Sequence, residues 1–206
     1  MKKESRGAVG ERSRRAILDA ALDCFTRLGW AATTIEDIRE VSGASVGSVY
    51  HHFGAKEGIA VALYLDCLRQ HQDTLKLQLE KATDAESFVR AVVIHTITWS
   101  RANPDAARYL IRMRREDAVA AAEPELQEAT GGFLLEGINR LKAYARDGQL
   151  LKLPSSAYLP LLQGPAQELL RHWAGGRMEL KPGIEKVLAD AAWRCLRPEP
   201  TGRREP

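Results

Sequence analysis

The sequence predicts an all-α fold of about nine helices, in which an N-terminal three-helix head with a helix-turn-helix precedes a larger helical bundle. Apolar residues recur at the spacing of amphipathic helices along most of the 206 residues, and no segment alternates polar and apolar residues as a strand would. Proline and glycine fall where one helix would end and the next begin. Between residues 33 and 58, two very short helices flank a Ser-Gly turn.

The first short helix is expected to begin after Thr34, whose hydroxyl can accept a backbone N–H of the first turn while Asp37 completes a capping box. Its buried face comprises Ile35, Ile38 and Val41. Gly43 ends the helix, because glycine adopts the left-handed conformation of a C-terminal cap without strain.

The second short helix is expected from Ser45 to about Phe53. Two helices joined by so tight a turn predict a helix-turn-helix, whose second helix can enter the major groove of DNA. Gly47 leaves room for the backbone to approach the sugar-phosphate chain. The outward polar side chains, which can bind phosphates or base edges, are Ser48, Tyr50, His51 and His52. The alternative is a helical hairpin whose polar face is only solvated.

Beyond the head, the sequence predicts helices over residues 56–82, 84–102, 104–115, 124–148, 155–173 and 182–196. Pro160 and Pro165 are expected to kink or interrupt the fifth of these. We expect a disordered basic arm over 1–10, the helix-turn-helix domain over 11–56, an effector-binding and dimerisation domain over 57–197, and a disordered tail over 198–206. The first 15 residues include six basic and two acidic residues, so this segment is positively charged. The charge could neutralise DNA phosphates, or it could only keep the terminus soluble.

Composition narrows the classes of function. The three cysteines are widely spaced, which indicates a reducing cytosol and neither a disulfide framework nor a zinc site. No run is long and apolar enough to span a bilayer, and the first residues lack the apolar block of a signal peptide, so we expect a cytoplasmic protein. The five histidines accompany no nucleophile, carboxylate pair or metal-ligand cluster. We therefore expect no enzyme activity, no metal and no cofactor.

From about Arg12 to Tyr64 the chain resembles the TetR family of one-component bacterial transcriptional regulators. The matching features are Ala16-Ile17-Leu18-Asp19-Ala20-Ala21, Phe25, Leu28-Gly29-Trp30, Thr33-Thr34-Ile35, Asp37-Ile38, Gly47, Tyr50, Phe53 and Lys56-Glu57. In that family the positions matching Thr34, Ser45, Gly47, Ser48, Tyr50, His52 and Lys56 commonly contact DNA, mostly its phosphates. The position matching Val46 and its neighbours help to choose bases. Together with His51, these residues form the predicted DNA-binding site.

Three departures from the family pattern matter. Ala44 stands where valine is common at the end of the turn, which slightly thins the core between the two short helices. Val46 stands where a polar or basic residue is frequent, so its expected base contact is apolar, such as a thymine methyl. The helix expected from Lys56 follows Ala55, where the family often has a capping residue, and Gly58 replaces an acidic box partner. A missing cap costs about 1 kcal/mol. We expect the first turn of this helix to fray and to act as a compliant joint.

The helix predicted over 84–102 is apolar on nearly every side, as expected for a helix in the middle of a bundle. With its neighbours it could line a small-molecule cavity, because ligand sites are mainly apolar with a few polar groups. The predicted effector-binding residues are Phe88, His95, Trp99, Tyr109, Met113 and Phe133. The alternative is a filled core around one hydrogen-bonded histidine, although most TetR-family relatives bind an effector in this region. Four arginines of the next predicted helix could bind an acidic ligand or the head domain, or form a solvated, salt-bridged face: Arg108, Arg112, Arg114 and Arg115.

The last two predicted helices carry apolar stripes with small residues between them. Two such pairs related by a two-fold axis would form a four-helix interface, and relatives dimerise in this way. The predicted interface residues are Leu162, Ala166, Leu169, Leu170, Trp173, Ile184, Val187, Leu188, Ala191 and Cys195. Two heads can then read half-sites about 34 to 36 Å apart.

The resemblance implies a homodimeric repressor that binds a palindromic double-stranded DNA operator and is released by a small-molecule effector of unknown identity. We expect the effector to displace the helix that begins at Lys56 and thereby change the spacing of the recognition helices. A differential affinity of about 1 to 3 kcal/mol between two shapes suffices for such coupling. Activation in place of repression stays open. The alternative function is a helical small-molecule-binding module without operator binding.

Overall fold

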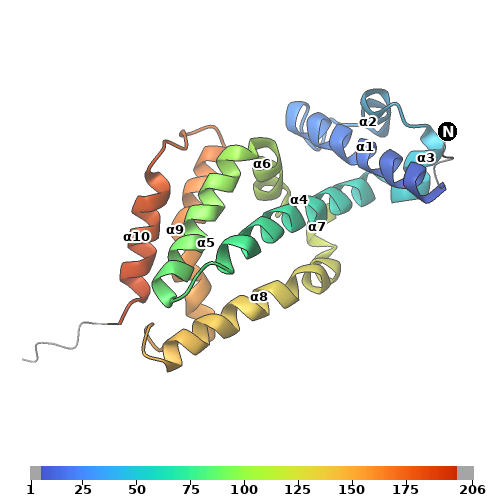
Figure 1. The fold of residues 1–206 in the computed structure, drawn as a ribbon. Helices are drawn as coiled ribbons and strands as arrows, with labels where there is room; N and C mark the ends of the chain where they lie inside the picture. The colour runs from blue at the N-terminus through green and yellow to red at the C-terminus, as the bar shows by residue number, and fades with distance from the viewer. Residues whose placement is uncertain (1–5, 199–206) are drawn as a thin grey trace, which may run out of the picture. The chain divides into compact units, whose positions relative to one another are not determined.

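The computed structural model describes residues 6–198, which form helices and turns without a strand (Figure 1). The helices of this stretch are α1 Arg6–Arg27, α2 Ile35–Ser42, α3 Val46–Phe53, α4 Lys56–Leu79, α5 Ala85–Ala102, α6 Pro104–Met113, α7 Asp117–Ala120, α8 Glu123–Arg146, α9 Ser155–Ala174 and α10 Ile184–Leu196. The predicted all-α fold class is confirmed. The short helix α7 was not predicted, because four residues are too few to show a periodic apolar pattern.

Helix α1 begins at Arg6, so residues 6–10 are helical although the sequence predicts a disordered arm there. Once the buried turns of a helix are formed, each further turn adds one hydrogen bond per residue at little cost. Residues 1–5 of the predicted arm and residues 199–206 of the predicted tail lie outside the described residues.

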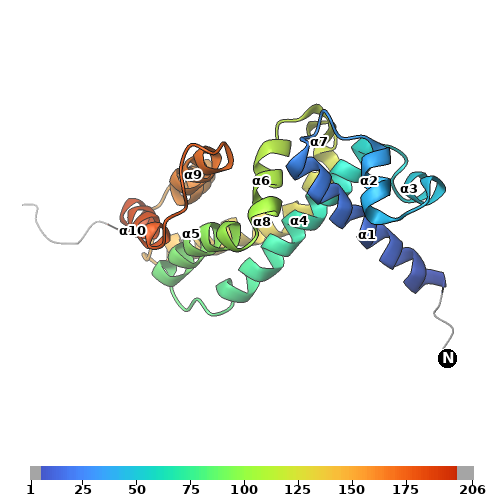
Figure 2. The ribbon, with the colours of Figure 1, turned by 90° about the horizontal axis from the view of Figure 1, so that it is seen from above.

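The chain packs as two compact units. The head unit comprises residues 6–69 and 103–127, and the body unit comprises residues 70–102 and 128–198. The head unit therefore includes α6 and α7 and the first half of α4, in addition to the three helices that the sequence assigns to the head. Helix α6 packs along α1 (Figure 2), where the ring of Tyr109 stacks on that of Phe25 with 5.7 Å between the ring centroids.

Helix α1 packs against both short helices of the head unit, α2 and α3. Its fully buried residues include Ile17, Leu18 and Ala21, and the two short helices each bury one side chain against this helix, Ile38 and Val49. The apolar face of each short helix is therefore fixed by α1, which leaves the opposite face of each helix outward. Val41, which the sequence predicts on the buried face of α2, is 51% exposed, so that prediction is wrong for this residue.

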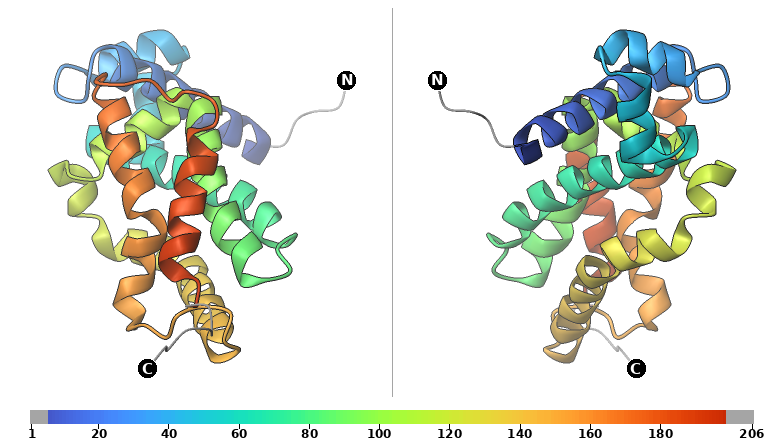
Figure 3. Two further views of the ribbon diagram at one scale, coloured as in Figure 1. Left: turned by 90° about the vertical axis from the view of Figure 1, so that its left-hand side faces the viewer. Right: turned by 90° about the vertical axis from the view of Figure 1, so that its right-hand side faces the viewer.

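Helices α5, α9 and α10 pack against one another in the body unit, and α9 and α10 run side by side (Figure 3). Helix α5 buries residues on several faces, as the sequence predicts for a central helix: Ala85, Phe88, Val89, Val92, Val93, His95, Ile97, Trp99 and Ser100. The sequence predicts that Pro160 and Pro165 either kink or interrupt α9. This helix continues through both prolines, so the interruption does not occur. The buried side chains of Tyr158, Leu162 and Ala166 hold this helix in place where two backbone hydrogen bonds are missing.

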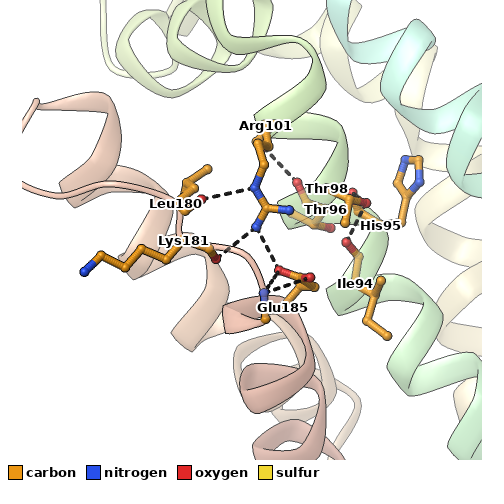
Figure 4. A network of polar contacts seen from close by, with 10 residues as sticks. Ile94, His95, Thr96, Thr98, Arg101, Leu180, Lys181 and Glu185 are labelled. Atoms are coloured by element: carbon orange, nitrogen blue, oxygen red, sulfur yellow. Dashed lines mark hydrogen bonds and ion pairs between the residues drawn. The ribbon is translucent and has the colours of Figure 1, made fainter.

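Two arginines tie the body unit together through main-chain carbonyls. Arg101 donates to the carbonyl oxygens of Leu180 (3.1 Å) and Lys181 (3.2 Å) in the segment before α10, and to the carboxylate of Glu185 at 2.8 Å (Figure 4). Arg140 donates to the carbonyls of Leu79 and Ala82, where α4 ends. No described helix is long and apolar enough to cross a membrane.

Candidate nucleic-acid interface and ligand sites

The capping box predicted at the start of α2 is present. The Thr34 hydroxyl accepts the N–H of Asp37 at 3.2 Å, and the Asp37 carboxylate accepts the N–H of Thr34 at 2.7 Å. Hydrogen bonds from the hydroxyl and the N–H of Thr34 lower the pKa of Asp37 below its ordinary value. Gly43 ends the helix in the left-handed conformation, with φ 68°, and donates to the carbonyl of Arg39. The entry into the helix-turn-helix is therefore fixed by residues that the sequence identifies.

Helix α3 presents an exposed surface of mixed chemistry. Ser45 caps it by accepting the N–H of Ser48 at 3.1 Å. Val46 and Tyr50 are about half exposed, at 49% and 51%, although both are large hydrophobic side chains. A Cβ added at Gly47 would meet no atom within 4 Å, so packing within the chain does not require this glycine. His51 is exposed as well.

Two members of the predicted DNA-binding site also make internal contacts. The hydroxyl of Ser48 lies 2.9 Å from that of Ser13, which joins the recognition helix to α1. The Lys56 ammonium donates to the carbonyls of Trp30 (3.1 Å) and Thr33 (2.9 Å) and lies 4.4 Å from the centroid of the Trp30 ring. Lys56 therefore fixes the loop before α2, and its ammonium has one N–H beyond these two bonds. His52 is half-buried beside Phe53.

The joint between α3 and α4 is tight. Gly54 adopts a positive φ of 72° and donates to the carbonyl of Tyr50 at 2.9 Å. A Cβ added at Gly58 would lie 2.0 Å from the carbonyl oxygen of Phe53, which is closer than real Cβ contacts come. Gly58 therefore lets the first turn of α4 lie directly against the last residue of the recognition helix. The sequence marks this glycine as a departure from the family pattern, and the structure shows what it accommodates.

The predicted effector-binding residues fall in two places. Phe88, His95 and Trp99 are buried in the body unit, and Phe133 packs half-buried against the same core. Tyr109 and Met113 belong to the head unit, where they are 4% and 3% exposed. The six residues therefore divide into a body group and a head group.

The body group includes one member of a pair of neighbouring histidines, His71 and His95. The Nε2 atom of His95 lies 3.2 Å from the carbonyl oxygen of His71 and 3.3 Å from the hydroxyl of Thr74. The two imidazole rings are 5.1 Å apart, and the edge of one of them, that of His71, packs on Trp99. Burial lowers the pKa of His71 to about 4, with the neighbouring His95 as a second cause, and burial also lowers the pKa of His95. Both rings are therefore neutral near pH 7 and can donate or accept hydrogen bonds.

The head group opens onto a cavity of about 110 Å³. Its apolar walls are the side chains of Phe25, Trp30, Tyr109 and Met113, and its charged residues are Arg108, Arg112 and Glu116. The Tyr109 hydroxyl donates to the carbonyl of Ala60 at 2.9 Å, and burial raises the pKa of this phenol. The sequence identifies Tyr109 and Met113 but not Phe25 and Trp30, which lie about 80 residues earlier in the chain and are brought there only by the packing of α1 on α6.

The predicted dimer residues differ in how much surface they offer. On α9, Leu162, Ala166, Leu170 and Trp173 are buried within the single chain. On α10, Val187 is 57% exposed and Cys195 is exposed, with Ala191 half-buried between them at helical spacing. The remaining members, Leu169, Ile184 and Leu188, pack half-buried against the body core. Within residues 6–198, no three His, Cys, Asp or Glu side chains gather closely enough to hold a metal ion.

Comparison with known proteins places the head among DNA-binding regulators. Residues 17–63 match the family model described as bacterial regulatory proteins, tetR family. The HTH-type transcriptional repressor AcnR of Corynebacterium glutamicum is 41% identical over 51 residues, which cover 25% of this chain and 27% of that protein. The HTH-type transcriptional regulator RutR of Escherichia coli K12 is 41% identical over 78 residues, which cover 34% and 35% of the two chains. The chain thus spans about a quarter to a third of the length of these relatives.

The fold extends the likeness beyond the head. The transcriptional regulator FadR of Bacillus subtilis, solved in complex with stearoyl-CoA, matches with a TM-score of 0.76 and 16% identity, covering 86% of this chain and 96% of that one. At this identity the match establishes the fold and says nothing of the ligand. The match includes helices of both units, well past residues 17–63.

Proposed function

Since this chain belongs to the TetR family of bacterial transcriptional regulators, we propose that it is a homodimeric repressor that binds a palindromic operator and is released by a small-molecule effector. Its DNA-binding domain is the helix-turn-helix of α2 and α3. The proposal adds the oligomeric state, the form of the operator and the direction of control. It also places the protein in the cytoplasm, where its operator would lie.

The observation that carries the proposal is the outward surface of α3. Val46 and Tyr50 are half exposed in a core-forming helix of eight residues, and exposing such side chains to water has no benefit for folding. Helix α1 fixes the other face of α3 through Val49 and Ser48. A rigid helix with a bare glycine at its second position can approach the wall of the major groove closely. Tyr50 would bind a phosphate, and Val46 would pack on a thymine methyl.

Dimerisation through α9 and α10 is proposed from the surface of α10 and from the geometry of DNA. Val187, Ala191 and Cys195 form a stripe that the single chain leaves uncovered to differing degrees. One head makes few contacts with DNA, and two heads on a two-fold axis would double them. A Val187→Glu variant places a charge in the proposed interface. It should shift the chain from dimer to monomer in analytical ultracentrifugation, whereas Val41→Glu, on the exposed face of the head, should not.

Effector release is proposed from the histidine pair and Trp99 in the body unit. His95 is buried and its Nε2 atom already has hydrogen-bond partners, whereas the neighbouring His71 is half-buried. Burial lowers the pKa of both rings, so they can offer an effector a polar contact without a charge to desolvate. One structural relative, FadR of Bacillus subtilis, binds stearoyl-CoA, which shows that this fold admits an acyl ligand in that protein. Here the effector would favour a shape of the body in which α4 is displaced. The uncapped start of α4 at Ala55 would then yield as the joint, and an Ala55→Ser variant should respond less to the effector.

Selection of bound duplexes from a random library, followed by fluorescence anisotropy on the selected sequence, tests this function. A palindromic site whose affinity falls at least tenfold in Tyr50→Ala supports the repressor, and Leu77→Ala, an exposed substitution in α4, serves as the control. Weak, non-palindromic binding that ignores Tyr50 would show that α3 does not read DNA. The alternative, a small-molecule-binding module without operator binding, would then stand.

A further inference from the structure

The cavity between α1 and α6 has the composition of a ligand site. Its apolar lining consists of three aromatic rings and one thioether, those of Phe25, Trp30, Tyr109 and Met113. The Phe25 ring meets Trp30 edge-on at 5.3 Å and stacks on Tyr109 at 5.7 Å, so the rings support one another and leave flat surface toward the cavity. All of these residues belong to the head unit. The site is therefore separate from the histidine pair of the body unit.

The charged residues at this cavity select the sign of the ligand. Arg108 and Arg112 lie four residues apart on α6, so both guanidinium groups lie on one side of the helix. Glu116 is the one acidic residue among the lining side chains. A guanidinium has five N–H donors, so each arginine can keep its present contacts and still bind a carboxylate. Arg108 also lies 3.9 Å from the exposed carboxylate of Asp105, which does not line the cavity. Among the lining side chains themselves, two cations against one anion favour an anionic ligand.

One polar group of the aromatic walls is already hydrogen-bonded, and a cation lies over another ring. The Tyr109 hydroxyl donates to the carbonyl of Ala60, and the Lys56 ammonium lies over Trp30 while bonding to the carbonyl of the same residue. The walls therefore offer mainly ring faces and edges, and the two arginines are the cationic groups among the lining side chains. At about 110 Å³ the cavity is smaller than the roughly 150 Å³ that is sufficient for benzene. A ligand of one ring would therefore lie only partly inside the cavity, against the aromatic walls, with its charged group extending toward the arginines.

We propose that the α1–α6 cavity binds a small planar organic anion, namely an aromatic carboxylate of about one ring, with the ring against Phe25, Trp30 and Tyr109 and the carboxylate on Arg108 and Arg112. This ligand contacts α1 and Trp30 directly. Trp30 contacts Lys56 at the start of α4, and α1 holds the recognition helix through Ser13 and Ser48. Occupancy therefore changes the affinity of the head for DNA, a consequence that rests on the proposed function. Binding itself does not depend on it.

Fluorine NMR of the full chain labelled with 5-fluorotryptophan tests the site directly. The chain has four tryptophans, so four resonances are expected, and a Trp30→Phe variant assigns the one that matters. Benzoate is the probe, titrated to about 10 mM at constant ionic strength, because a ligand of this size reaches a Kd of about 1 mM or tighter. The Trp30 resonance should shift saturably while those of Trp99, Trp173 and Trp193 stay in place.

Matched variants and neutral or cationic probes complete the test. Arg112→Gln should weaken benzoate binding at least tenfold, whereas Arg115→Gln, an exposed arginine that does not line the cavity, should leave it unchanged. Benzyl alcohol and benzamidine should bind at least tenfold more weakly than benzoate. A Trp30 resonance that does not saturate, a shift of Trp99 alone, or equal binding of the three probes would overturn the proposal. No DNA is present, so a failed operator selection leaves this result intact.

Discussion

Replacing Gly58 by alanine is expected to weaken both the fold and the binding of DNA. The added Cβ would lie 2.0 Å from the Phe53 carbonyl oxygen, and real Cβ atoms keep at least 3.0 Å from such atoms. The carbonyl must therefore retreat by about 1 Å, and overpacking of this kind costs about 1 to 3 kcal/mol. The higher helix propensity of alanine stabilises the fold by about 1 kcal/mol, which offsets part of this cost. The net loss of stability is then at most about 2 kcal/mol.

DNA binding is affected as well because Phe53 is the last residue of the recognition helix. Helix α3 has eight residues and is held near its start by Ser48, so a shift of about 1 Å at its end turns the exposed face that Tyr50 occupies. Operator affinity should fall more than tenfold, which is about 1.4 kcal/mol at the DNA contacts alone. Fluorescence anisotropy on the selected operator measures the affinity, and urea unfolding followed by circular dichroism measures the stability.

Gly132→Ala is the matched control, because Gly132 lies within α8 and a Cβ there would meet no atom within 4 Å. This variant should be as stable as the parent or more stable by up to about 1 kcal/mol, with unchanged affinity. Wild-type affinity and stability in Gly58→Ala would refute the reasoning, since the carbonyl would then not be held against this glycine.

Four further outcomes are expected. Thr34→Ala removes the cap of α2 and should lower the free energy of unfolding by about 1 kcal/mol in urea titrations, with Thr34→Ser close to the parent. Lys56→Met should destabilise the head by about 2 kcal/mol, and the slope of log Kd against log salt will change by about one only if the ammonium also contacts a phosphate. Arg101→Lys cannot reproduce the three contacts of the guanidinium and should lower the melting temperature of the chain, as followed by circular dichroism. Because His71 binds its proton less readily when folded, stability should fall as the pH drops from about 6.5 to about 4, and His71→Gln should flatten that part of the pH profile.

Much of the structure of the head can be predicted from residues that are close together in the sequence. The Thr34-Asp37 capping box and the stop at Gly43 depend on residues at most four positions apart, so the pattern alone predicts them correctly. The exposure of Val46 and Tyr50 follows from the period of the helix and the buried position of Val49. Helix boundaries in the body agree with the positions of proline and glycine within a few residues.

Contacts between distant segments are what the sequence does not predict. The pairing of Lys56 with the carbonyls of Trp30 and Thr33 leaves no trace in the pattern, because a carbonyl is present at every residue. The α1–α6 cavity joins Phe25 to Tyr109, and periodicity says which face of each helix is apolar without saying which faces meet. The predicted effector-binding set accordingly mixed residues of two units.

Three cations, Lys56, Arg101 and Arg140, hold other parts of the chain by main-chain carbonyl oxygens. A carbonyl remains when the side chain of its residue changes, so these contacts do not constrain the identity of the residues that accept them. They constrain only the course of the backbone. The segments at 30–33, 79–82 and 180–181 can therefore accumulate substitutions over evolution without loss of these ties, whereas inserting or deleting a single residue there would move the carbonyls out of reach.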